Sequence, residues 1–257
     1  MGIVMLDNKV LMSGNQMALY VPPPPMPVKG DIVNLDLDGQ GAKQYRVIKC
    51  NGNVAQVMAM YDTLTSKWNT DTSKTTTMGT LTVAKYDGSD IDIYLNTTWY
   101  NTLTDTAKAA IVPESVVCDA WYWNNSGDPD YTGTYGNSVP GTNNYTISKY
   151  AGGTLNIGNR NVFALGVQDV IDYLNDSSVQ VDTTAILRNV NIWKMFWNDE
   201  VSHSGNPWLR SSFVDDSISV WSVRVDSGRL GGDYVFYSYV VRPALNLNLN
   251  QVEFTVV

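Results

Sequence analysis

Apolar and polar residues alternate over the last third of the chain, a pattern typical of strands with one buried face. In the stretch WSVRVD, which begins at Trp221, every second residue is apolar. Successive side chains of a strand point to opposite faces, so we expect an inward apolar row and an outward polar row that starts at Ser222. Leu245–Asn250 alternates in the same way. From Trp193 onward the pattern therefore predicts strands of an antiparallel sheet.

Earlier in the chain, apolar residues recur at helical spacing. Thr104 can cap the N-terminus of a short helix through its hydroxyl group. This helix is expected to run to Ala110 and to end before Pro113. Two further sets of apolar residues have the spacing of one helix face each. The first set is Ile91, Tyr94, Leu95 and Trp99. The second set is Val167, Val170, Ile171 and Leu174.

Turn signals complete the coarse picture. Asn51-Gly52 lies between two apolar runs and predicts a β-hairpin. Residues 124–148 are mostly Asn, Gly, Ser, Thr, Asp and Tyr, which predicts a long loop. With few helices early and an antiparallel sheet in the C-terminal part, the expected class is α+β.

The proline run divides the chain into two parts. Residues 1–29 are rich in Met and end in the sequence VPPPPMPVK, which begins at Val21. Consecutive prolines favour an extended, stiff geometry, so we interpret 1–29 as an attachment arm through which the protein forms oligomers. Residues 30–257 are expected to form the ligand-binding domain.

Composition excludes several classes of protein. The chain has 257 residues, 44% hydrophobic and 16% charged, which is typical of a globular protein. A net charge of -8 argues against nucleic acid as a partner, because phosphate binding needs a basic surface. No stretch approaches the roughly 20 apolar residues of a membrane span, so membrane insertion is not expected.

Two observations bear on localisation and on disulfides. The first ten residues lack the basic and apolar regions of a signal peptide, which favours a virion component over a bacterial cell-surface protein. Cys50 and Cys118 are too few for a disulfide framework, so we expect two buried thiols, with a single bridge as the alternative.

Motifs that carry catalysis are missing from the sequence. His203 is the one histidine, which rules out a His-based triad or a multi-His metal site within one chain. Neither a phosphate-binding glycine loop nor a nucleophile elbow occurs. We therefore expect a protein that is not an enzyme and needs no cofactor.

If the protein does bind a cofactor, the sequence points to calcium. The stretch FWNDE, from Phe196 to Glu200, resembles the tripeptide whose Asn and Asp bind calcium in animal C-type lectins. A calcium-dependent sugar site would then use Asn198 and Asp199. The flanking cysteines are absent, so the other interpretation is a buried Trp197 followed by a polar turn.

The residues between Val201 and Asn250 come from a restricted set. This fifty-residue segment contains no Lys, Glu, Gln or Met, although these types make up 29 of the 257 residues. An even distribution would place five or six of them there.

The order of several motifs resembles the C-type-lectin-fold variable proteins of diversity-generating retroelements. WLRSS at Trp208 and VRPALNL at Val241 are the most specific pieces of that resemblance. Weaker pieces lie between Gly30 and Leu249, and they are GDIV, YRVIKCNGNVAQVMAMYD, YLNTTWYNTLTDTAKAAI and VFALGVQDVIDYL.

The resemblance implies a diversified ligand surface on a C-type-lectin-like fold, with a variable region at about 201–241. In such systems AAC codons become N-N-C codons, which cannot encode Lys, Glu, Gln, Met or Trp. The expected variable, ligand-binding residues are Ser202, His203, Phe213, Val214, Asp215, Asp216, Ser217, Ser219, Ser222, Arg224, Asp226, Arg229, Asp233, Tyr234, Phe236, Tyr237 and Tyr239.

Fixed residues must hold such a surface. We expect Arg210 and Arg242 to be buried or half-buried donors to backbone carbonyls. The expected ligand is a protein or a surface glycan on a host or target cell, since family members act in phage receptor binding or in bacterial adhesion. The expected core anchors are Trp208, Leu209, Val220, Trp221, Val223, Val235, Val241 and Leu245.

Overall fold

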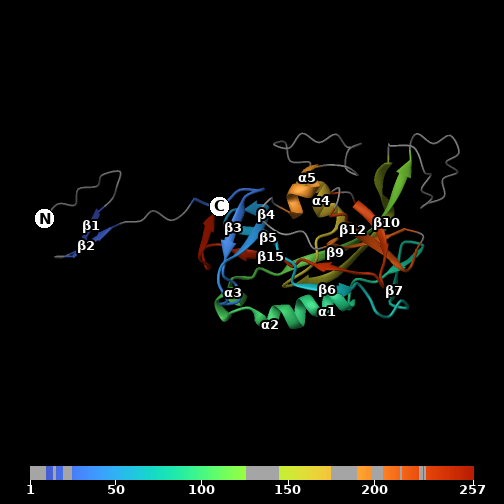
Figure 1. Cartoon of the computed structure of the whole chain (residues 1–257), viewed down its shortest axis with the longest axis horizontal. Coiled ribbons are helices and arrows are strands. Elements are labelled where there is room, and N and C mark those ends of the chain that lie inside the picture. Colours follow the sequence, from blue (N-terminus) through green and yellow to red (C-terminus); the bar gives the residue numbers. More distant parts are fainter. Residues whose placement is uncertain are drawn as a thin grey trace.

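The fold is mostly β-structure with a few short helices (Figure 1). The computed structural model describes residues 10–13, 16–19, 25–125, 145–174, 190–197, 205–214, 216–225, 228 and 230–257. The expectation of an α+β class is confirmed in this coarse form. Within the described residues, no helix is both long enough and apolar enough to cross a membrane.

The first large sheet combines the middle of the chain with the C-terminal segment. Its order is β10-β9-β11-β12-β13, in which β11 runs parallel to β9 and the other neighbours are antiparallel. The strands are β9 (Glu114–Asn125), β10 (Tyr145–Arg160), β11 (Trp208–Phe213), β12 (Ser219–Val223) and β13 (Leu230–Tyr234).

The second large sheet joins the two ends of the domain in the order β15-β5-β4-β3-β16, all antiparallel. Leu245 of β15 lies opposite Val57 of β5, so strands from both ends of the chain share one ladder. The expected sheet in the C-terminal part is present, but it also takes in strands that precede the helices. The strands are β3 (Ile32–Leu35), β4 (Lys43–Asn51), β5 (Val54–Ala59), β15 (Ala244–Asn248) and β16 (Phe254–Val256).

Among the described residues, three two-stranded ladders complete the β-structure. The expected hairpin at Asn51-Gly52 is confirmed as β4–β5, where Gly52 adopts a positive φ of 58°. The strands of the small ladders are β1 (Val10–Ser13) with β2 (Gln16–Leu19), β6 (Leu64–Lys67) with β14 (Ser238–Val241), and β7 (Thr75–Met78) with β8 (Leu81–Ala84).

The first group of helices lies on one side of the strands (Figure 1). The Thr104 hydroxyl accepts from the Ala107 amide at 3.1 Å, which confirms the expected N-cap. The expected helix with Ile91 and Leu95 on its buried face contains a π-helical segment. The bounds are α1 (Asp90–Ile93), π-helix η1 (Tyr94–Trp99), α2 (Tyr100–Thr102) and α3 (Asp105–Ala110).

Two more helices, α4 (Val167–Leu174) and α5 (Val190–Phe196), lie on the opposite side of the strands (Figure 1). The apolar face expected for α4 is confirmed, because Val167, Val170 and Leu174 are buried. Trp193, however, belongs to α5, so strands do not begin there. The predicted loop at 124–148 is also too long at both ends, because β9 continues to Asn125 and β10 begins at Tyr145.

Two buried arginines connect the C-terminal strands to the rest of the domain, as expected. Arg210 donates to the carbonyls of Val117 (2.9 Å) and Ala164 (2.8 Å) and pairs with Asp169. Arg242 donates to the Phe196 carbonyl and to Asp62 Oδ1, at 3.0 Å from Nη2. These carboxylates were not foreseen, and they neutralise charges that would be costly to bury alone.

The expected core anchors are all buried, from Trp208 to Leu245. The buried apolar residues of the described ranges form two clusters, and each cluster draws residues from both sides of 126–144. The two cysteines are free, and Cys118 is buried. Cys50 is exposed, so the expectation of two buried thiols is wrong for it. Its strand, β4, is exposed from Lys49 to Asn51, next to the hairpin turn.

Candidate functional site

The most distinctive surface feature is a group of three exposed aromatic residues at the end of β13 and in the turn to β14, which we call the aromatic patch. Tyr234, Phe236 and Tyr237 keep 41%, 38% and 42% of their surface exposed. The rings of Tyr234 and Phe236 stack at 5.1 Å, and Tyr237 meets both of them edge-on. Exposed aromatic groups of this kind are typical of binding surfaces, because rigid rings bury a large area at little entropic cost.

The main chain holds the aromatic patch in place. Val235, inside the patch sequence, is buried and its amide donates to the Ile218 carbonyl at 2.9 Å. Its carbonyl accepts from the amides of Trp68 (2.9 Å) and Asn69 (3.1 Å). Because Val235 points inward, its neighbours Tyr234 and Phe236 point outward. The turn is thus fixed by groups that do not depend on the identity of the exposed side chains.

Tyr239 connects the patch to the interior. Its ring packs on the buried Trp208, with centroids 4.6 Å apart. Its hydroxyl donates to Asp233 Oδ1 at 3.0 Å and accepts from Arg224 Nη1 at 3.1 Å. Partial burial, followed by the nearby Asp233 charge, raises the pKa of Tyr239. The residue is therefore half-buried and serves both the scaffold and the surface.

Asp233 is the centre of the polar network beneath the patch. Its carboxylate is buried, pairs with Arg224 Nη2 at 2.8 Å and accepts from the Ser222 hydroxyl. Together with Tyr239, these partners give the carboxylate three donors. A buried carboxylate with this many donors is an anchor for the surrounding strands and not a free contact residue.

Two glycines that were not anticipated leave room for the side chains of Arg224 and Phe213. A Cβ at Gly231 would lie 2.7 Å from Arg224 Nε, and one at Gly232 would lie 2.8 Å from Phe213 Cδ2. Both contacts are too short for real side chains. The sequence signal was the Gly-Gly pair within β13, which often marks such a close approach.

The structure corrects the expected display surface at four positions. Ser222 lies on the polar row that was expected to face outward, but its hydroxyl is turned onto Asp233. Ser219 donates to the Asp216 carboxylate at 2.5 Å. Small polar residues with buried hydrogen-bond partners cannot be distinguished from exposed ones by alternation alone. The four residues that are buried instead of displayed are Val214, Ser219, Ser222 and Asp233.

The remaining expected residues fall into two groups. Phe213 is half-buried and packs on Trp221 at 5.2 Å, while Asp216 accepts from the Ile218 amide at 3.0 Å within its own turn. Ser217, Arg224 and Tyr239 are also half-buried. The expected positions that lie outside the described residues are Ser202, His203, Asp215, Asp226 and Arg229.

The alternative calcium site, Asn198 and Asp199, also lies outside the described residues. Trp197, just before it, is buried, as the other interpretation expected. Across the described ranges, no group of three or more His, Cys, Asp or Glu side chains is arranged to hold a metal ion.

One family model matches the chain. It covers residues 62–249 and is described as Domain of unknown function (DUF6273). The matched region includes the aromatic patch and its polar network, and it excludes β3, β4, β5 and β16. No curated protein and no solved structure matches the chain.

Proposed function

Because the chain belongs to the DUF6273 family, whose description carries no activity, we propose a function from the site itself. The protein is a non-enzymatic binding protein that presents the aromatic patch to a macromolecular ligand. The observation that carries this proposal is the contrast within 234–237, where three exposed rings flank one buried valine. Monomeric surfaces rarely expose contiguous aromatic area without a partner.

The ligand class in this proposal is a protein or a glycan on the surface of a host or target cell. Stacked and edge-on rings offer apolar area, and the hydroxyls of the exposed Tyr234 and Tyr237 offer hydrogen-bonding groups. This combination suits either ligand, because hot spots on proteins and sugar rings both pack on aromatic faces. Attachment of a virion or a cell is the role that such contacts would serve.

The scaffold in the proposal is C-type-lectin-like, and the C-terminal segment is its diversified region. Two observations support this second step. Apart from Trp208 and Trp221, the composition of 201–250 is compatible with N-N-C codons, and the buried core anchor Val235 lies between the exposed Tyr234 and Phe236. In this proposal the buried Ser222 and Asp233 belong to the scaffold. The display surface then consists of the aromatic patch and the half-exposed residues around it.

Binding is tested with the full-length protein on a glycan array and on a panel of intact bacterial cells. The test variant replaces Tyr234, Phe236 and Tyr237 by Ser together. Ile93→Ser is the matched control, because Ile93 is an exposed apolar residue on α1. We expect the signal to be lost in the triple variant and kept in the control. A signal that survives the triple substitution would overturn the patch as the binding surface.

Diversification is tested separately by sequencing the gene and its neighbouring DNA in a growing population. We expect a reverse-transcriptase gene, a near-copy template, and codon variation at Tyr234, Phe236 and Tyr237 with constant codons at Trp208 and Trp221. Invariant codons without such a template would remove diversification from the proposal, and the binding role of the patch would still stand on its own test.

A further inference from the structure

A single carboxylate at the start of β9 bridges two side chains of the other large sheet. Glu114 accepts a hydrogen bond at Oε1 from the ammonium group of Lys49, whose Nζ lies 3.2 Å away. Its second oxygen, Oε2, accepts from the side-chain amide nitrogen Nδ2 of Asn246. An amine and a carboxamide therefore share one carboxylate, and we call Lys49, Glu114 and Asn246 the bridged triad.

The register of the sheet places the bridged triad. Lys49 of β4 lies opposite Gln56 of β5, and Gln56 lies opposite Asn246 of β15. The three side chains therefore leave the same face of the sheet in one row. The amide of Val112 donates to the Asn246 carbonyl at 3.0 Å, which holds the chain just before Glu114 beside β15. From there the Glu114 side chain reaches both ends of the row.

Two buried carbonyl oxygens in this row have no hydrogen-bond donor. Gln56 and Asn246 keep only 2% and 7% of their surface exposed. Among the described residues, none donates to Gln56 Oε1 or to Asn246 Oδ1. Buried polar atoms without a partner are rare and destabilising, so each of them calls for an explanation. A new N–H group formed within the row would supply a donor where one is lacking.

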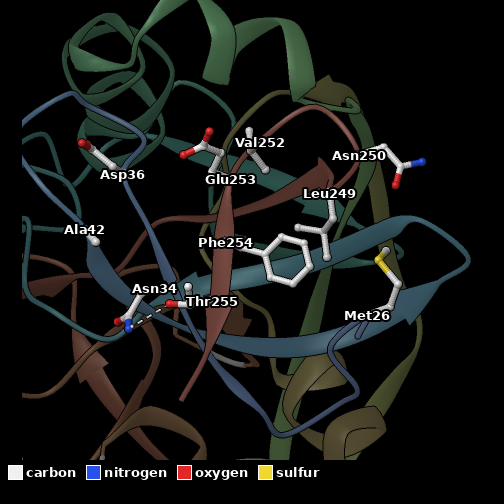
Figure 2. A pocket seen from close by; sticks show the side chains of 10 residues that line it. All are labelled: Met26, Asn34, Asp36, Ala42, Leu249, Asn250, Val252, Glu253, Phe254 and Thr255. Atoms are coloured by element: carbon white, nitrogen blue, oxygen red, sulfur yellow. Dashed lines mark hydrogen bonds between the residues drawn. The ribbon is translucent and has the colours of Figure 1, made fainter. Parts of the chain in front are cut away.

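A groove beside β16 is a second feature at this end of the domain, and it is separate from the triad. Its volume is about 780 Å³, and no residue of the triad lines it. Figure 2 shows the ring of Phe254 in this groove directed toward Leu249 and Met26. Of these two features, only the bridged triad brings together groups that can react with one another.

We propose that Lys49 and Asn246 join in an intramolecular isopeptide bond, with Glu114 as the catalytic residue. The neutral amine of Lys49 attacks the side-chain carbonyl carbon, Cγ, of Asn246. A bond forms between Nζ and Cγ, the bond between Cγ and Nδ2 breaks, and the amide nitrogen leaves as ammonia. The reaction is an acyl transfer to a nucleophilic amine, so it needs no oxidant, reductant or cofactor.

Glu114 is placed to move the proton that this exchange requires. Its Oε1 faces Lys49 Nζ and takes a proton from the amine, and its Oε2 faces Asn246 Nδ2, so the carboxyl group can pass a proton to the leaving nitrogen. Overall, one ammonium group and one carboxamide give one secondary amide and one ammonium ion, so atoms and charge balance. The side chains of Lys49 and Glu114 are 55% and 29% exposed, which lets the ammonia leave.

The reaction runs once in each chain and has a structural result. Because one scaffold holds the amine and the amide together, their effective concentration is high and no turnover is needed. The new N–H at Nζ lies in the row beside Gln56, whose Oε1 lacks a donor. The bond joins β4 to β15 and closes a covalent loop that contains the aromatic patch. Such a loop restricts the unfolded chain, as a disulfide of the same span does.

The bond is tested by mass spectrometry of the full-length protein after prolonged incubation at mildly alkaline pH. We expect an intact mass that is lower than the mass of the unreacted chain by one ammonia. A tryptic digest should contain a branched peptide in which Lys49 is joined to Asn246, and trypsin should not cut after Lys49. A chain that keeps its full mass and yields no branched peptide overturns the proposal, and the triad is then a static ion pair.

Variants separate this reaction from other losses of ammonia. Lys49→Arg keeps the positive charge and Asn246→Ala removes the acyl group, and both should keep the full mass. The matched control is Lys67→Arg, which changes an exposed lysine of β6 and should react like the wild-type protein. A loss of ammonia that persists in Lys49→Arg comes from another residue and contradicts the proposal.

The role of Glu114 is tested by the rate at which the branched peptide appears. Glu114→Gln keeps the size of the side chain but cannot take up the proton, so we expect the rate to fall roughly a hundredfold or more. Circular dichroism checks that the variant is folded. A folded Glu114→Gln protein that reacts at the wild-type rate would remove the catalytic role from Glu114, whereas the mass of the wild-type protein decides on the bond itself.

Discussion

Tyr239 donates its hydroxyl to Asp233 at 3.0 Å, and this bond joins the strands on either side of the aromatic patch. Asp233 belongs to β13 and Tyr239 to β14, which lie in different sheets. The bond therefore closes the base of the turn and holds the exposed rings over a buried, fully partnered carboxylate.

The contribution of this bond can be measured with a double-mutant cycle. We expect Tyr239→Phe to lower the free energy of unfolding by about 1.5–3 kcal/mol, because it removes the hydrogen bond to the charged Asp233 together with the one accepted from Arg224. Asp233→Ala should lower it by roughly 1–3 kcal/mol, since the buried Ser222 hydroxyl loses its acceptor. Urea unfolding of both single variants and the double variant gives the coupling, and fully additive effects would show that the two residues act independently.

Scaffold and surface should respond differently to truncation. Trp221→Ala should cost roughly 3–5 kcal/mol, because it removes a buried aromatic side chain from beside Phe213 and leaves a cavity. Tyr237→Ser, on the exposed patch, should change stability by no more than about 0.5 kcal/mol. Thermal unfolding of the two variants makes the comparison, and a Tyr237 variant that unfolds as readily as the Trp221 variant would place the patch in the core.

Stability should fall in alkaline solution. Burial raises the pKa of Tyr61 to about 12, and it also raises the pKa of Tyr45, whose hydroxyl lies 2.8 Å from that of Tyr61. An unfolded tyrosine ionises near pH 10, so the folded state binds more protons between pH 10 and 12. The contribution of these groups is fully present below pH 10 and is lost as the pH rises through their folded values.

The measurement for this effect is urea unfolding at a series of pH values from neutral to alkaline. The variant Tyr61→Phe should show a shallower loss of stability above pH 10, because one of the shifted groups is gone. Identical pH profiles for the wild-type protein and the variant would contradict the assignment to Tyr61.

The two thiols should differ in reactivity. Burial raises the pKa of Cys118 to about 12, and its side chain is inaccessible. Cys50 is exposed, although partial desolvation also raises its pKa. Iodoacetamide at mildly alkaline pH should therefore modify Cys50 and leave Cys118 intact until the protein is unfolded. Peptide mapping by mass spectrometry identifies the modified residue, and early modification of Cys118 would show that its environment opens.

Calcium should have no effect on stability if the domain is a binding scaffold alone. We expect the same Tm with chelator and with millimolar calcium. A rise with calcium that is lost in Asn198→Ala would instead support the sugar-binding alternative, because a ligand that binds the folded state stabilises it by mass action.

Local sequence patterns predicted helices and strands better than they predicted which polar side chains are buried. The caps and apolar faces of α3 and α4 followed from Thr104 and from the spacing around Val170, since both signals depend on neighbours in sequence. Alternation also identified β12 and the inward position of Trp221. It could not show that Ser222 is buried, because the partner that buries it, Asp233, comes from the adjacent strand.

Longer-range pairing was beyond the sequence pattern. Nothing near Leu245 indicates that β15 completes a sheet with β5, almost two hundred residues earlier. The helix α5 was missed because it is only seven residues long, too short for its periodicity to stand out from the strand-like residues that follow. Tyr234, Phe236 and Tyr237, in contrast, were among the residues expected on the display surface, and all three are exposed.

The attachment of Val235 has a consequence for engineering. Its hydrogen bonds to Ile218, Trp68 and Asn69 all use main-chain atoms, which every amino acid except proline provides. Substitutions at 234, 236 and 237 leave those atoms in place, so a synthetic repertoire could be built at these positions without redesigning the host domain. Selection from such a repertoire by surface display would yield new affinity reagents that bind through residues 234–237.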